Sequence, residues 1–183
     1  MKTIFFDVFG TLITQPGHRI DGYSRLFSAE RLPFMTRNVD IEVFAEELGR
    51  EHLLPMIRRE LASEMAAFVL FDDVACSLQQ LRALGYRIGL CTNLAKPYGV
   101  AVHALLPGLD AYVFSYKVGF KKPQPEIYQA ACDALNCRPE EVLFIGDNRE
   151  ADLEGPQAFG MQARVIDRKG GQTLKDVLQM ELA

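Results

Sequence analysis

The sequence predicts an α/β protein with a doubly wound parallel sheet and a small all-helical cap inserted after the first strand. In the second half, short apolar runs alternate strictly with amphipathic segments. In the first half, one apolar run at 2–6 stands alone, and the next begins only at Tyr86. Alternating strands and helices form right-handed crossovers, which leave the strands parallel and the helices on both faces of the sheet. We therefore expect a core domain of residues 1–13 and 72–183 and a helical cap of residues 14–71.

Each expected element rests on its own pattern. The strands are expected at the apolar runs 2–6, 86–91, 111–114, 142–145 and 162–166. The helices are expected at 74–84, 96–106, 125–135, 151–159 and 173–182. Gly85 follows the first helix as a C-terminal stop, and Pro125 stands in the first turn of the third. Within 14–71, apolar residues recur at spacings of three and four, so this segment is expected to be entirely helical.

Composition narrows the class of protein. The chain has 183 residues, 49% of them hydrophobic, which is enough for one domain with an insertion and a core that needs no disulfide. Its net charge is −4, so it has no basic field to attract a nucleic acid or an anionic membrane. Its apolar runs are too short for an export signal or a membrane span. We expect a cytoplasmic protein, monomer or homodimer, whose partner is a small-molecule substrate.

The cysteines do not suggest a metal site or a disulfide framework. Four are present, at positions 76, 91, 132 and 137, and none has CxxC or Cys/His spacing. We expect them to be buried, reduced packing residues.

Polar residues follow the expected strands at the points where these end. They are Asp7, Thr92, Asn93, Lys122, Asp147 and Asp152. In a doubly wound sheet, ligands bind beyond the carboxyl ends of the strands, so these side chains should converge at one edge. A carboxylate, a hydroxyl and an ammonium group suit attack on phosphorus. Asp7 would be the nucleophile, while Thr92 and Lys122 would hold the phosphoryl oxygens.

The charges at this edge favour a metal cofactor. Three carboxylates (−3) and Lys122 (+1) with a phosphate dianion (−2) give a net charge of −4. Such crowding would raise the carboxyl pKa values and disable the nucleophile. A hard divalent ion relieves it, and the all-oxygen surroundings favour Mg²⁺.

Four motifs resemble those of the haloacid dehalogenase superfamily. They are Asp-Val-Phe-Gly-Thr at 7–11, Cys-Thr-Asn at 91–93, Lys-Pro-Gln-Pro-Glu-Ile-Tyr at 122–128 and Phe-Ile-Gly-Asp-Asn-Arg-Glu-Ala-Asp at 144–152. The resemblance implies that Asp7 is a covalent nucleophile that binds Mg²⁺ together with Asp147 and the backbone carbonyl of Phe9. It also implies that Thr11 and Asp152 do not bind the metal directly but support the residues that do, with Asp152 orienting Lys122 or a metal-bound water. The substrate would contact Gly10, Thr92, Asn93 and Lys122.

Phe9 departs from the pattern of most phosphatases of this superfamily, which carry a second Asp at this position. That Asp protonates the leaving oxygen and then activates water, and such help is typically worth about 10²- to 10⁴-fold. Phe9 can do neither. The rate of hydrolysis should therefore be reduced more for alkyl phosphate esters than for acyl phosphates, phosphoanhydrides or aryl phosphates. A cap residue such as His18 or Tyr23 is a candidate substitute.

Two other functions fit parts of the sequence. An aromatic residue at position 9 resembles the 2-haloacid dehalogenases, in which Asp7 would attack carbon and halide would leave. Such an enzyme needs a cap arginine, for which Arg19, Arg25 and Arg37 are candidates, but its fourth motif resembles Ser-Ser-Asn rather than the Gly-Asp-Asn found at 146–148. A phospho-ligand-binding protein without turnover is the second alternative. A two-component receiver is excluded by the order of its acidic residues and lysine.

Overall fold

The computed structural model describes residues 3–14 and 34–179. Its main element is a five-stranded sheet in the order β5-β4-β1-β6-β7. The strands are β1 (Thr3–Phe6), β4 (Arg87–Thr92), β5 (Ala111–Phe114), β6 (Val142–Gly146) and β7 (Gln162–Val165). Every pair of neighbours is parallel, and β1 lies between β4 and β6. The α/β doubly wound fold predicted from the sequence is confirmed, and the strand bounds agree to within one residue on the described part of the chain.

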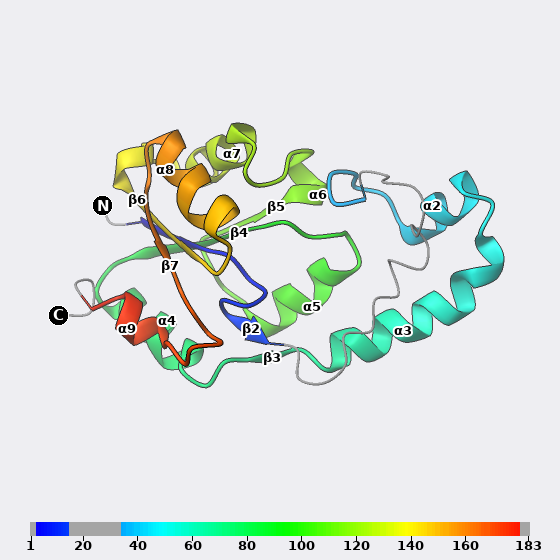
Figure 1. Cartoon of the computed structure of the whole chain (residues 1–183), viewed down its shortest axis with the longest axis horizontal. Helices are drawn as coiled ribbons and strands as arrows, with labels where there is room; N and C mark the ends of the chain where they lie inside the picture. The colour runs from blue at the N-terminus through cyan, green and yellow to red at the C-terminus, as the bar shows by residue number, and fades with distance from the viewer. Residues whose placement is uncertain (1–2, 15–33, 180–183) are drawn as a thin grey trace.

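Helices cover both faces of this sheet, as Figure 1 shows. They are α4 (Val74–Ala83), α5 (Tyr98–Leu105), α6 (Ser115–Val118), α7 (Pro125–Leu135), α8 (Gly155–Phe159) and α9 (Leu174–Val177). Alternate residues of β1 divide between two hydrophobic clusters, because side chains of a strand point to opposite faces. Ile4 and Phe6 pack with side chains of α4, α5 and α9, whereas Phe5 packs with side chains of α7.

The expected cap forms a lobe beside the core and rests on the loop that follows β4 (Figure 1). It contains α2 (Ile41–Glu47), a 3₁₀ turn η1 (Glu51–Leu53) and α3 (Leu54–Ala66). Their apolar faces enclose Phe44 and Ile57, and Ala95 of the core completes that cluster. Residues 15–33 of this segment lie outside the described residues, so the division of the chain at 14 and 71 stays a prediction.

The expectation that 14–71 is entirely helical was wrong at both ends of the segment. The strands β2 (Ile13–Thr14) and β3 (Val69–Leu70) pair antiparallel where the chain leaves the core and returns to it. Two-residue strands are too short to show a periodic pattern, so only the pairing of distant segments reveals them.

Several helices also differ from expectation. The expected helix at 151–159 is a π-helical turn η3 (Arg149–Glu154) followed by α8. The closing helix expected at 173–182 is the single turn α9 within the described residues. A short 3₁₀ turn, η2 (Pro139–Glu141), precedes β6, and α6 directly follows β5 without a sequence signal. None of the described helices is long and apolar enough to span a membrane.

The cysteines are free thiols, but only part of the expectation about them is correct. Cys91 and Cys132 are buried, Cys137 is half-buried, and Cys76 is exposed on α4. Burial raises the pKa of the Cys91 thiol to about 12, which keeps it protonated and unreactive.

Candidate active site

The site lies where β4, β1 and β6 end side by side. Asp7 follows β1 directly, and its backbone N–H donates to the carbonyl of Ile145 on β6 at 2.8 Å. The chain then turns tightly, because the carbonyl of Val8 accepts from Leu12 and Ile13, both at 2.9 Å. This turn keeps the Asp7 side chain, which is 8% exposed, at the carboxyl edge of the sheet.

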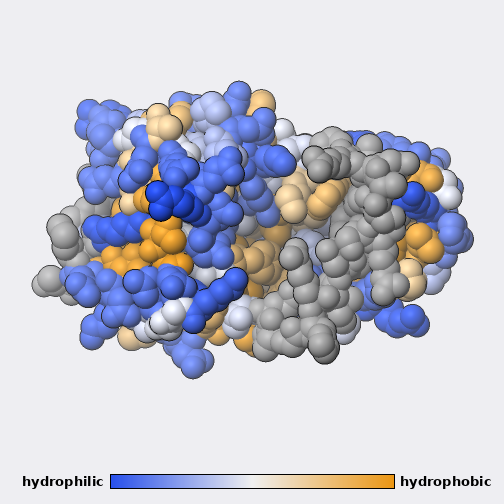
Figure 2. All heavy atoms as spheres, in the orientation of Figure 1, coloured by the Kyte–Doolittle hydropathy of each residue, from blue (hydrophilic) through white to orange (hydrophobic). Residues whose placement is uncertain are grey.

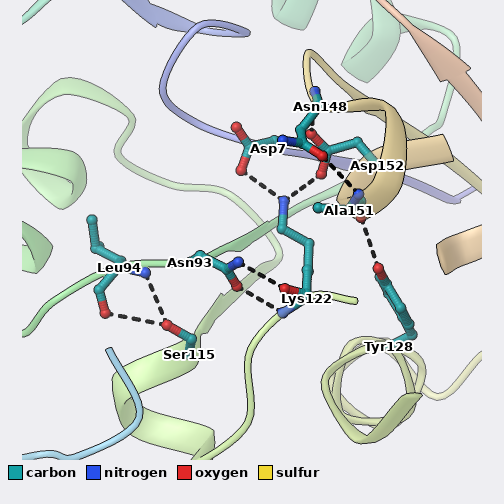
Figure 3. A network of polar contacts seen from close by, with 9 residues as sticks. All are labelled: Asp7, Asn93, Leu94, Ser115, Lys122, Tyr128, Asn148, Ala151 and Asp152. Atoms are coloured by element: carbon teal, nitrogen blue, oxygen red, sulfur yellow. Dashed lines mark hydrogen bonds and ion pairs between the residues drawn. The ribbon is translucent and has the colours of Figure 1, made fainter. Parts of the chain in front are cut away.

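Lys122 bridges two of the carboxylates, as Figure 3 shows. Its Nζ lies 2.7 Å from Oδ1 of Asp7 and 2.5 Å from Oδ1 of Asp152. All three side chains are buried. Burial alone would lower the pKa of Lys122, but the negative charges of Asp7 and then Asp152 outweigh it and raise this pKa. Lys122 is therefore a fixed cation at neutral pH.

Asn93 holds the backbone of this lysine in place. Its side-chain amide donates to the Lys122 carbonyl at 2.9 Å and accepts from the Lys122 N–H at 2.7 Å (Figure 3). Ser115 supports the same loop, since its hydroxyl accepts from the N–H of Leu94 at 2.9 Å and donates to the Leu94 carbonyl at 3.2 Å. Asn93, expected as a substrate ligand, thus also supports Lys122.

The π-helical turn η3 positions Asp152 behind the site. Oδ2 of Asp152 accepts from the backbone N–H of Asn148 at 2.9 Å, while its other oxygen faces Lys122. Tyr128 of α7 fixes the same turn by donating its hydroxyl to the Ala151 carbonyl at 2.7 Å (Figure 3). Burial and then the charge of Asp7 raise the pKa of Asp152 to about 6, against the opposing influence of Lys122. Sequence reasoning missed the roles of Ser115 and Tyr128, which only the folded contacts reveal.

Three carboxylates lie close enough to share a cation. One oxygen from each of Asp7, Asp147 and Asp152 lies within 4.8 Å of the others. Although Asp147 is an exposed residue, partial burial of its carboxyl and then the charge of Asp7 raise its pKa. A carboxyl whose pKa is raised by a neighbouring carboxylate is an environment that a bound cation would stabilise.

The loop after Asp7 is shaped to pass directly against Asp147. Gly10 has a φ of +77°, and a Cβ at this residue would lie 2.2 Å from Oδ2 of Asp147. Only glycine tolerates both that backbone conformation and that approach. The hydroxyl of the next residue, Thr11, is buried without a hydrogen-bond partner among the described residues. The oxygen-rich donor set, the close approach at Gly10 and the orphaned hydroxyl fit a small, hard cation such as Mg²⁺.

Phe9 belongs to a cluster of three aromatic rings at the cap side of the site. Its ring lies 4.8 Å from Phe68, at the end of the cap segment, and 6.4 Å from Tyr98 at the start of α5, between ring centroids. Tyr98 in turn donates its hydroxyl to Glu64 on α3 at 2.9 Å. Phe9 is thus packed against aromatic rings at the cap side of the site.

The other predicted site residues have different outcomes. Thr92 ends β4 next to β1 and is buried. The guanidinium of Arg37 donates two hydrogen bonds to Glu47, at 2.7 and 2.6 Å, within the cap lobe. It is therefore occupied and does not meet the residues gathered at Asp7. The candidates His18, Arg19, Tyr23 and Arg25 lie outside the described residues.

Fold and site together define a doubly wound α/β protein with an aspartate-lysine-aspartate cluster at the carboxyl edge of its sheet. Comparison with known families identifies it further: a family model of haloacid dehalogenase-like hydrolases matches residues 1–160. The chain belongs to this family.

Named relatives are phosphatases. The phosphoglycolate phosphatase of Salmonella typhimurium is 38% identical over 130 residues, covering 67% of this chain and 49% of that protein. The pyrophosphatase PpaX of Bacillus cereus is 27% identical over 186 residues, covering 91% of this chain and 83% of that protein. The chain spans about half the length of the first of these relatives.

Solved structures share the fold. A HAD phosphatase from Thermococcus onnurineus has a TM-score of 0.68 at 23% identity, covering 99% of this chain and 98% of its own. A HAD family enzyme from Bacteroides thetaiotaomicron, solved with magnesium and inorganic phosphate, has a TM-score of 0.73 at 19% identity, covering 97% and 98%. A structure described as a dehalogenase has a TM-score of 0.69 at 23% identity, covering 98% and 96%.

Proposed function

We propose that this chain is a Mg²⁺-dependent phosphohydrolase that transfers the phosphoryl group of a small molecule to Asp7 and then to water. The observation that carries the proposal is the asymmetric environment of the Asp7 carboxylate. Lys122 holds Oδ1 at 2.7 Å, while Oδ2 accepts no hydrogen bond from the described residues. One oxygen is thus anchored and the other is available for attack.

In the proposed reaction, Oδ2 of Asp7 bonds to phosphorus as the bond from phosphorus to the leaving oxygen breaks, and the leaving group takes that electron pair. Lys122 and the hydroxyl of Thr92 would bind phosphoryl oxygens, where charge accumulates. Water then attacks phosphorus, the aspartyl–phosphate bond breaks, and the carboxylate is regenerated, while the protons of the water leave with the product phosphate. These steps follow nucleophilic catalysis by a carboxylate.

Asp7, Asp147 and the backbone carbonyl of Phe9 would hold Mg²⁺. The ion, when bound, offsets negative charge between the carboxylates and the phosphate. Gly10 allows the loop to lie against Asp147. Asp152 accepts a hydrogen bond from Lys122 and so holds its ammonium group in position. The Bacteroides enzyme with magnesium and phosphate has this fold, which supports the assignment of the cofactor.

The residues around Phe9 indicate the class of leaving group. Phe9 contacts Phe68 and Tyr98; the two phenylalanine rings have no proton to give, and the hydroxyl of Tyr98 is engaged by Glu64 at 2.9 Å. A leaving group that needs no proton therefore suits this site: an acyl phosphate, a phosphoanhydride or an aryl phosphate. PpaX, a relative matched over most of this chain, is named for phosphoanhydride hydrolysis, which agrees with this class.

The test measures phosphate release from acetyl phosphate, pyrophosphate, 4-nitrophenyl phosphate and glycerol phosphate, with Mg²⁺ and with a chelator. Asp7→Asn keeps the shape of the side chain and removes the nucleophile, while Asp133→Asn on the exposed surface of α7 is the matched control. We expect Mg²⁺-dependent turnover that Asp7→Asn abolishes and Asp133→Asn preserves. Failure of the wild type to release phosphate from all four substrates would refute the proposal.

A 2-haloacid dehalogenase is a second candidate because Phe9 is aromatic and halide leaves without a proton. Asp147 argues against the dehalogenase function, because its carboxylate beside Asp7 would repel a carboxylate substrate. Halide release from 2-chloropropionate, absent in Asp7→Asn, would establish this alternative. Mg²⁺-dependent phosphate binding without turnover would instead indicate a binding protein.

A further inference from the structure

Arg168, in the loop after β7, contacts the loop that carries Asp7. Its Nε and Nη2 donate to the backbone carbonyl of Thr11 at 3.0 and 2.8 Å. The two segments are 157 residues apart in sequence. The side chain of Arg168 is only 8% exposed, and no motif in the sequence marks it as part of the site.

The third nitrogen of the Arg168 guanidinium, Nη1, is also hydrogen-bonded. Nη1 donates to both carboxylate oxygens of Asp73, at 2.9 and 3.0 Å, and to the Gln172 carbonyl at 3.1 Å. The guanidinium also lies over the ring of Phe71, 4.3 Å from its centroid. Asp73 is held in turn, because it accepts from the N–H of Leu174 at 2.5 Å. The planar guanidinium of Arg168 is therefore held in one orientation. It donates from three nitrogen atoms, whereas a lysine has a single ammonium nitrogen.

These contacts join three segments at one point: the loop after β1, the chain returning from the cap and the loop after β7. Phe71 also donates its N–H to the Leu12 carbonyl at 3.1 Å. The start of the loop after β1 is held by the hydrogen bond from the Asp7 N–H to the Ile145 carbonyl. Its far end is held by the hydrogen bonds from Arg168 to the Thr11 carbonyl. Phe9 and Gly10 lie between these two anchors.

We propose that Arg168 is a positioning residue for this site. By holding the Thr11 carbonyl, it fixes the conformation of residues 8–10 and so the placement of the Asp7 carboxylate and the Phe9 carbonyl. Through Asp73 it makes that placement depend on the segment that returns from the cap. This inference rests on the proposed function for its catalytic readout, and on metal binding for an independent one.

The chain offers a matched control in Arg87. This arginine is also partly buried; it donates to the carbonyl of Leu135 and to the hydroxyl of Thr3 at 3.0 Å. It lies at the amino ends of β4 and β1, opposite the carboxyl edge that carries the site. Arg168→Met and Arg87→Met each remove a guanidinium bonded to a backbone carbonyl, and only the first should disturb the site.

The experiment compares wild type, Arg168→Met, Arg168→Lys and Arg87→Met. The readouts are the melting temperature, the Mg²⁺ concentration that gives half of the Mg²⁺-induced rise in melting temperature, and kcat and KM with acetyl phosphate. For Arg168→Met we expect kcat to fall by about 10- to 100-fold, because small misplacements of reacting groups have effects of this size. KM should change less than threefold, and the half-saturating Mg²⁺ concentration should rise. Arg168→Lys should recover melting temperature through its charge but not kcat.

The outcomes separate the two proposals. A wild type without turnover on any of the four phosphates named above refutes the phosphohydrolase, and the half-saturating Mg²⁺ concentration alone then decides the role of Arg168. Equal kcat and equal Mg²⁺ dependence in Arg168→Met and Arg87→Met would make Arg168 a structural residue only. If Arg168→Met does not fold, Arg168→Lys carries the test: a lysine variant with wild-type kcat and Mg²⁺ dependence overturns the inference. A wild type that Mg²⁺ does not stabilise overturns both proposals.

Discussion

The ring of Phe9 lies edge-on against the ring of Phe68, with their centroids 4.8 Å apart and their planes at 62°. This contact joins the loop after β1 to the end of the cap segment. It also places an apolar, half-buried side chain two residues after Asp7. Under the proposed function, this one side chain would bear both on the leaving group and on the packing of the cap.

Replacing Phe9 by Asp should change which substrates are hydrolysed. A carboxyl group between Phe68 and Tyr98 would be partly desolvated, which favours its protonated form and suits a general acid. We expect hydrolysis of glycerol phosphate to rise about tenfold or more relative to acetyl phosphate, below the full range of about 10²- to 10⁴-fold for a well-placed acid. Phe9→Leu is the apolar control and should leave the ratio unchanged. An unchanged ratio in Phe9→Asp would show that leaving-group protonation does not limit this site.

Gly10→Ala should damage the site more than a comparable change elsewhere. The new Cβ would lie 2.2 Å from Oδ2 of Asp147, at a φ of +77°. Gly108→Ala is matched, because Gly108 has a φ of +66° and no atom within 4 Å of the added Cβ. Both variants should lose about 1 kcal/mol of unfolding free energy from backbone strain, measured by urea denaturation. Only Gly10→Ala should also weaken Mg²⁺ stabilisation, and equal Mg²⁺ responses in the two variants would contradict the assignment of Asp147.

Tyr98→Phe should loosen the contact between the cap and the core. It removes the donor to Glu64, a carboxylate that is only 7% exposed. A buried acceptor that loses its partner costs about 1–3 kcal/mol, so the free energy of unfolding should fall by that amount. The double variant Tyr98→Phe with Glu64→Leu should recover part of the loss, because no buried carboxylate is then left unpaired. Additive losses in a double-mutant cycle would show that the two side chains do not interact.

His103 should make the stability of the fold depend on pH, independently of the charged residues at the candidate active site. Its ring lies 4.1 Å from that of Tyr112, and burial and then the charge of Lys117 lower its pKa below 6.5. Since the folded state binds this proton less readily than the unfolded state, the folded protein is favoured at high pH. The contribution is complete above about pH 6.5 and is lost as pH falls through the lowered pKa. His103→Phe keeps the ring contact and should flatten this part of the profile of melting temperature against pH; an unchanged profile would argue against His103 as its source.

Much of the core and the identity of the charged cluster follow from local patterns. The apolar run of β6 and the polar residues that follow it are neighbours in sequence, so strand and site residue are predicted together. Parallel strands then bring Asp7, Lys122 and Asp152 to one edge by topology alone, and the 2.7 Å contact of Lys122 with Asp7 agrees with that expectation.

Tertiary structure decided the features that have no local signal. The β2–β3 ribbon pairs residues from the two ends of a long insertion, and the π-helical turn at 149–154 replaces a regular helix where Asp152 must face Lys122. Asn93 supports the lysine backbone, and Arg168 reaches Thr11 across 157 residues. Such contacts depend on where distant segments meet, whereas periodicity and strand ends depend on neighbours in the chain. For that reason the sequence by itself determined the class of fold and predicted which charged side chains gather at one edge of the sheet, and only packing decided what holds those side chains in place.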